Sequence, residues 1–85
     1  MNKLKIVLRE KDKTGAIEFS VPVIELTREN PTQTFTVTIK EGYRIDDYMA
    51  TDVSVKRNGN EFTVSATKKI KGEDEIYLNF FLSEE

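Results

Sequence analysis

Residues 34–40 read Thr-Phe-Thr-Val-Thr-Ile-Lys, and this strict alternation of apolar and polar side chains decides the fold class. Phe35, Val37 and Ile39 fall on one face of an extended chain, and the threonines with Lys40 fall on the other. β-Branched and aromatic residues fit such a half-buried pleated surface. The stretch therefore predicts a β-strand with one face in an apolar core.

The same period of two recurs in residues 61–68, where three residues share the inner face: Phe62, Val64 and Ala66. Residues 53–57 alternate as well, and Asn58-Gly59-Asn60 joins the two stretches. Asn-Gly is a strong hairpin signal because both residues tolerate the positive φ of a type I′ turn. The pattern therefore predicts a β-hairpin over residues 53–67.

Further alternation lies toward both ends of the chain. Near the N-terminus three residues share one face: Leu4, Ile6 and Leu8. In residues 75–82 the apolar face consists of Ile76, Leu78, Phe80 and Leu82. Successive side chains of a strand point to opposite faces, so this last strand is expected to direct three residues outward: Tyr77, Asn79 and Phe81.

The parity of the apolar residues changes around Pro22. An inner face is expected from three residues that precede it: Ile17, Phe19 and Val21. A proline cannot donate to a ladder, so it marks an edge strand or a strand end. Beyond it, Ile24 and Leu26 take the opposite parity, which a bulge or a crossing between two sheets would produce.

Residues 43–52 lack this alternation. Ile45, Tyr48 and Met49 have the i, i+3, i+4 spacing of a helix, and Asp46 could cap its first turn. We predict one helical turn or an irregular link in this part of the chain.

The pattern as a whole predicts one all-β domain over residues 1–85, a small antiparallel β-sandwich of six to seven strands, with a small β-barrel as the alternative. The order of residues 35–39, 41–43, 53–64 and 80–82 resembles the immunoglobulin-like modules of bacterial surface proteins and phage virion proteins. This resemblance implies an adhesive, spacer or decorating role and transfers no functional residue. The Cys and Trp residues of antibody cores are missing.

The amino-acid composition lacks residue types that several kinds of chemical site require. The chain has no Cys and no His, so thiolate ligands, disulfides and the commonest general base are missing. The paired carboxylates at 46–47 and 73–75 lack the spacing of a calcium loop. We therefore expect no enzyme, no catalytic residue, no cofactor and no metal site. The net charge of −2, from 15 acidic and 13 basic residues, argues against a nucleic-acid partner.

Neither a signal-peptide core nor a membrane-spanning apolar run occurs in the sequence. The expectation is synthesis in the cytoplasm without a signal peptide, no membrane partner, and a virion as one final location.

The outward residues of the last strand are the main candidate site. Tyr77, Asn79 and Phe81 are predicted to contact another protein, because exposed aromatic side chains anchor interfaces. Acidic residues at 73–75 and 84–85 would form a rim, and the strand could offer a free edge. The alternative is intramolecular cover by residues 43–52, with Tyr43, Tyr48 and Met49 as packing partners.

A second candidate is a basic patch of Lys68, Lys69 and Lys71, with Lys56 and Arg57 as neighbours across the hairpin. It could bind phosphate or an acidic partner. The other interpretation is that outward lysines discourage pairing between sheet edges.

Three functions follow from these observations. The leading hypothesis is a structural or protein-interaction module, an accessory or decoration subunit of a larger assembly such as a phage virion, with self-association into a homo-oligomer left open. The alternative is a small intracellular inhibitor of the phage anti-defence type that binds a host protein. The third is carbohydrate binding through Tyr43, Tyr48 or Tyr77, although Trp, the usual sugar platform, is missing.

Overall fold

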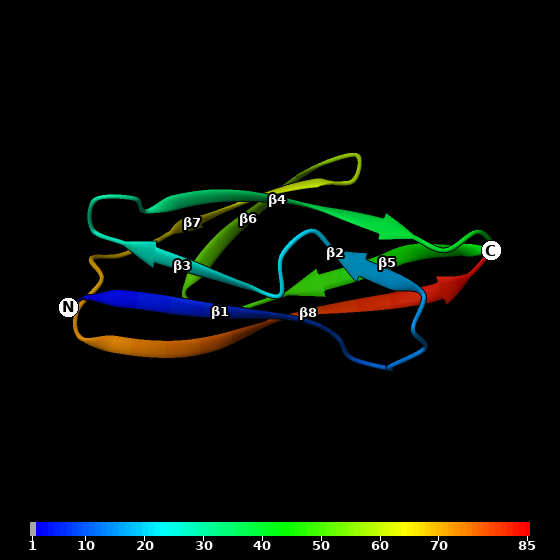
Figure 1. Cartoon of the computed structure of the whole chain (residues 1–85), viewed down its shortest axis with the longest axis horizontal. Helices are drawn as coiled ribbons and strands as arrows, with labels where there is room; N and C mark the ends of the chain where they lie inside the picture. The colour runs from blue at the N-terminus through cyan, green and yellow to red at the C-terminus, as the bar shows by residue number, and fades with distance from the viewer. Residues whose placement is uncertain (1) are drawn as a thin grey trace.

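A computed structural model describes residues 2–85 of the chain as a two-layer β-sandwich (Figure 1). It contains eight strands: β1 (Lys3–Glu10), β2 (Ile17–Phe19), β3 (Val23–Thr27), β4 (Thr32–Ile39), β5 (Tyr43–Met49), β6 (Val53–Asn58), β7 (Glu61–Ala66) and β8 (Glu73–Glu84). One sheet has the order β3-β1-β8-β5 and the other β2-β4-β7-β6. The all-β sandwich is therefore confirmed. The expected six to seven strands were too few, and the barrel alternative is wrong because the sheets do not close.

One pairing departs from the expected antiparallel sandwich. β1 and β8 run parallel, with Lys3 opposite Glu73 and Glu10 opposite Phe80. All other neighbouring strands are antiparallel. Strands joined by a short turn must be antiparallel, but β1 and β8 come from opposite ends of the chain, so no turn fixes their relative direction.

The predicted hairpin is confirmed as β6 and β7, but its turn type is not. Asn58 lies opposite Glu61, so the two central turn residues are Gly59 and Asn60. Gly59 has a φ of 64°, whereas Asn60 is not among the residues with positive φ. A positive φ at the first central residue alone matches a type II′ turn, which favours glycine at that position.

The change of parity around Pro22 is a crossing between the two sheets. β2 belongs to one sheet and β3 to the other, and Pro22 lies in the link between them. Its carbonyl accepts a hydrogen bond from the amide of Leu8 at 3.1 Å. Ile24 and Leu26 are buried as their parity predicts, but Val21 is 39% exposed and does not join the inner face.

The predicted helical turn in residues 43–52 is wrong, because β5 occupies most of this stretch. Ile45 lies opposite Leu82 and Asp47 opposite Phe81, which leaves Asp46 as one extra residue. This bulge shifts the alternation by one position. Ile45 and Tyr48 therefore both face the core although they are three residues apart, and the bulge mimics helical spacing.

The core is built around a cluster of aromatic rings from both sheets. The rings of Phe62 and Phe80 are fully buried, and their centroids lie 5.1 Å apart at nearly a right angle. Tyr48 packs edge-on against Phe62 at 5.2 Å, and Phe35 stacks on Phe62 at 5.5 Å. Edge-to-face contacts of this kind add to the stabilisation from burial.

The loop after β1 is closed by one carboxylate. The Glu10 side chain is 9% exposed and accepts hydrogen bonds from the Thr14 and Gly15 amides, each at 2.9 Å, and from the Thr14 hydroxyl. Burial alone raises the pKa of Glu10, but the hydrogen bonds from this loop outweigh it, and the pKa is lowered overall.

We predict that Phe80→Ala lowers the free energy of unfolding by about 3–5 kcal/mol, because it leaves a cavity in the aromatic cluster. Phe81→Ala, one residue along on the outer face, should cost clearly less. Urea melts of the two variants provide the measurement, and equal losses would contradict the assigned faces.

We predict that Glu10→Gln destabilises the protein by about 1–2 kcal/mol at neutral pH, because hydrogen bonds to a charged acceptor are weakened. The lowered folded-state pKa means that ionised Glu10 stabilises the fold at pH values above the ordinary pKa of a glutamate carboxyl. This contribution is lost as pH falls through the folded value. Urea melts at several pH values should show that the unfolding free energies of the wild-type protein and the variant converge in acid. If the difference between these free energies grows in acid instead, the proposed role of the carboxylate is refuted.

Candidate functional site: the outer face of the β3-β1-β8-β5 sheet

The structure places the three predicted interface residues on one exposed surface. Tyr77 is 44% exposed, and Asn79 and Phe81 are half-buried, all on the outer side of β8. The residues between them, Leu78 and Phe80, are fully buried. The predicted assignment of faces on this strand is confirmed, while the contact with a partner stays a prediction.

Arg9 of β1 fixes the exposed ring. The parallel register puts Arg9 opposite Asn79, two residues from Tyr77. The Arg9 Nε donates a hydrogen bond to the Asn79 side-chain oxygen at 2.6 Å, and its guanidinium carbon lies 4.1 Å from the Tyr77 ring centroid. A cation over an aromatic face is attracted by the ring quadrupole. Asn79 orients Arg9, which in turn restrains Tyr77. The alternation of residues 3–9 directs Arg9 outward with Lys3 and Lys5, but its place beside Tyr77 depends on the pairing of β1 with β8, which the sequence does not show.

Apolar side chains also lie near Tyr77 on the outer side of this sheet. Val7 lies opposite Tyr77 on one side and opposite Val23 on the other, and Met49 lies opposite Asn79. Met49 is 56% exposed. We call this surface the aromatic face; it consists of Val7, Val23, Met49, Tyr77 and Phe81.

Residues 43–52 do not cover the aromatic face, contrary to the alternative considered above. β5 lies beside β8 in the same sheet, so Met49 extends the face. Tyr48 points inward onto Phe62, and Tyr43 is partly buried against the core. The aromatic face is therefore open to solvent within residues 2–85.

One end of the face is bordered by ion pairs. Lys3 lies 3.5 Å from Glu25 and 3.7 Å from Glu73, and Lys5 lies 3.6 Å from Glu75. The expected acidic rim is thus interleaved with lysines at this end. Such exposed pairs contribute little stability, so their main effect is to make a polar border of mixed charge.

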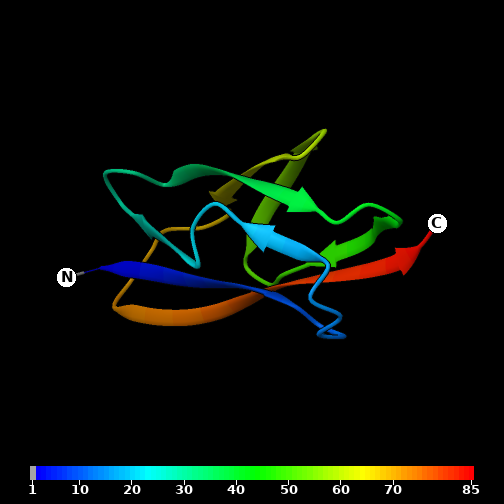
Figure 2. The same cartoon turned by 45° about the vertical axis from the view of Figure 1, so that its right-hand side comes forward.

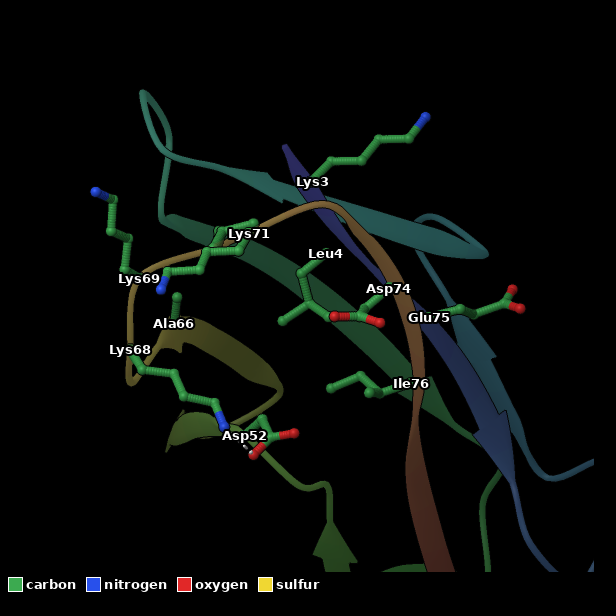
Figure 3. A pocket seen from close by; sticks show the side chains of 11 residues that line it. Lys3, Leu4, Asp52, Ala66, Lys68, Lys69, Lys71, Asp74, Glu75 and Ile76 are labelled. Carbon is green, nitrogen blue, oxygen red and sulfur yellow. Dashed lines mark ion pairs between the residues drawn. The ribbon is translucent and has the colours of Figure 1, made fainter. Parts of the chain in front are cut away.

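The basic residues 68, 69 and 71 lie in the loop between β7 and β8. Lys56 and Arg57 do not join them, because the register puts this pair opposite Thr63 and Phe62, toward the hairpin turn. Lys68 forms an ion pair with Asp52 at 3.2 Å. The three lysines border an open pocket of about 540 Å³ whose apolar side chains come from Leu4, Ala66, Ile70 and Ile76 (Figure 3).

Within residues 2–85 no three His, Cys, Asp or Glu side chains come close enough to hold a metal ion. The same part of the chain contains no helix long and apolar enough to cross a membrane. Comparison of the chain with protein-family models, with curated protein sequences and with solved structures finds no match. The aromatic face and the pocket beside it are the two candidate sites that the geometry offers.

We predict that Arg9→Ala costs about 1–2 kcal/mol of stability, since both the hydrogen bond to Asn79 and the contact with the Tyr77 ring are lost. The NMR signals of the Tyr77 ring should shift because the cation above it is gone. Lys5→Ala, two outward positions away from Arg9 on β1, serves as the control. An identical change of the Tyr77 signals in that variant would argue against a specific Arg9 contact.

Proposed function

We propose that this protein is a non-enzymatic interaction module that binds another protein through the aromatic face. The observation that carries the proposal is the exposed Tyr77 ring, restrained by Arg9 of the neighbouring strand β1. A large ring that is already ordered loses little conformational entropy on binding. Tyrosine and arginine are also the residue types enriched among residues that dominate binding energy.

The most suitable setting is an accessory or decoration subunit of a larger assembly, such as a phage virion. The sandwich is small and elongated, 41 × 22 × 18 Å, which suits a domain that presents a face to a neighbour. The sequence has no Cys or His to supply common nucleophiles, bases or metal ligands. We further propose that the sandwich is of the immunoglobulin-like kind, as the order of sequence patterns suggests.

A small inhibitor of a host protein is the second candidate, because a rigid aromatic surface would serve a tight one-to-one complex equally well. Carbohydrate binding has less support. Of the three tyrosines considered for it, Tyr48 packs inward and Tyr43 is partly buried, which leaves Tyr77 as a single exposed ring.

We predict that replacing both Tyr77 and Phe81 with Ser abolishes partner binding and leaves the β circular-dichroism spectrum unchanged. The matched control replaces Thr34 and Thr63 with Ala on the outer face of the other sheet, where their hydroxyls are 3.2 Å apart. Affinity capture followed by light scattering measures binding and separates a homo-oligomer from a complex with another protein. Retained binding in the first variant, or equal loss in the control, would contradict the proposal.

A further inference from the structure

β8 has strand partners on both sides along only part of its length. β1 pairs with it from Glu73 to Phe80, whereas β5 pairs with it only from Asn79 to Glu84. After Met49 the chain leaves this sheet and begins β6 in the other one. In Figures 1 and 2 the first half of β8, drawn in orange, runs along the lower margin of the molecule with no strand beyond it.

The backbone groups at this margin have no partner. The Gly72 and Phe80 carbonyls accept hydrogen bonds from the amides of Lys3 and Lys11, each at 2.9 Å. The backbone groups of the even-numbered residues therefore face β1, and those of Glu73, Glu75 and Tyr77 face the other way. The β5 ladder stops at Asn79, so it does not reach these three residues, and no loop backbone group within residues 2–85 bonds to their N–H or C=O groups. We call residues 73–77 the open edge.

We infer that the open edge receives an extended segment of the partner protein, antiparallel to β8 and in line with β5, by strand addition. This inference rests on the proposed function, since it describes how the same partner is held. The segment would satisfy the free backbone groups and would end beside Tyr77. It would thereby extend the aromatic face by one further strand.

The charges and the pocket beside the open edge indicate which residue types the partner segment should have. On its outer side it would face Glu73 and Glu75, which pair with Lys3 and Lys5 on the β1 side only. Their side chains stay 63% and 51% exposed, so basic residues of the segment suit the positions opposite them. On its inner side lies the pocket with apolar residues such as Ala66 and Ile70. Figure 3 shows Ile76 directed toward this pocket and Glu75 directed away from it. The expected segment therefore alternates basic and apolar residues.

A second copy of the chain fits this edge poorly. Antiparallel pairing of two open edges around Glu75 would place two carboxylates directly opposite each other, and like charges in that position destabilise a sheet. Asp74 and Lys68, which also line the pocket, add charge beside the edge. Such charges discourage indiscriminate strand pairing, and they leave the edge selective for a complementary segment.

The test uses a capped synthetic peptide, Thr-Val-Lys-Val-Lys-Val-Thr, titrated into isotope-labelled protein. In antiparallel pairing, the residues opposite Glu73, Glu75 and Tyr77 donate hydrogen bonds. The two lysines of the peptide lie opposite Glu75 and Glu73, and its first threonine lies opposite Tyr77. N-methylation of the two lysines should weaken binding at least about tenfold. N-methylation of the first and last valines of the peptide, whose N–H groups point away from β8, should change binding little. NMR shifts should concentrate at residues 73–77. Equal binding of both methylated peptides, or no binding at roughly millimolar peptide, would overturn the inference.

A protein variant gives an independent check. Glu75→Pro removes an N–H that faces the gap and takes part in no ladder, so β1 pairing is kept. Glu75→Ala is the matched control that removes the same carboxylate but keeps the N–H. Peptide binding should be at least about tenfold weaker in the proline variant than in the alanine variant. Equal binding by two folded variants would refute strand addition.

The two proposals can fail separately. If the peptide does not bind, but the protein with Tyr77 and Phe81 replaced by Ser loses its partner, the aromatic face is the interface and the open edge is not. If the peptide pairs with residues 73–77 while that double variant keeps its partner, the edge is the binding site and the aromatic face is not.

Discussion

The parallel pairing of β1 with β8 is the contact on which the rest of the structure depends. These two strands occupy the interior positions of their sheet, and each supplies buried residues to the core. The same register sets Arg9 beside Asn79 and the lysines of β1 beside the glutamates of β8. Because the paired residues are 70 positions apart, as in the Arg9–Asn79 hydrogen bond, the chain must close a long loop before this pairing stabilises it. The aromatic face therefore exists only in the complete fold.

The open edge has its origin in the way β5 leaves the sheet. After Met49 the chain turns through residues 50–52, where Asp52 has a φ of 63°, and enters the other sheet as β6. The Asp52 carboxylate binds Lys68 at 3.2 Å, and its carbonyl accepts a hydrogen bond from the Thr67 hydroxyl at 3.1 Å. These contacts join the β5–β6 connection to the β7–β8 connection, beside the ends of the paired strands β6 and β7. They hold the connection in place without supplying a strand for the first half of β8.

The sequence predicted well which side chains of a strand face the core, and poorly which strands are neighbours in a sheet. Alternation in β4, β7 and β8 shows which side chains enter the core, because that depends only on the geometry of one strand. The partner of each strand depends on contacts between distant segments, so neither the parallel pairing nor the position of Arg9 could be read locally. In β5 a single extra residue, Asp46, changed the spacing of apolar residues from two to three and suggested a helix. Tyr77, Asn79 and Phe81 could be assigned to the outer face, whereas the open edge required the extent of β5 pairing.

An exposed aromatic patch and an unpaired strand edge are both unfavourable in a protein that acts alone, because each promotes association with other chains. Here they adjoin, and Tyr77 belongs to both: its ring lies on the aromatic face and its backbone lies on the open edge. The surrounding charges restrict association without removing either feature, since Lys5 and Glu75 form their ion pair at the border of both. A partner that covers the ring and pairs with the edge would satisfy apolar surface and backbone groups together. The joint placement of two such features around one residue therefore supports the proposed contact with a partner protein.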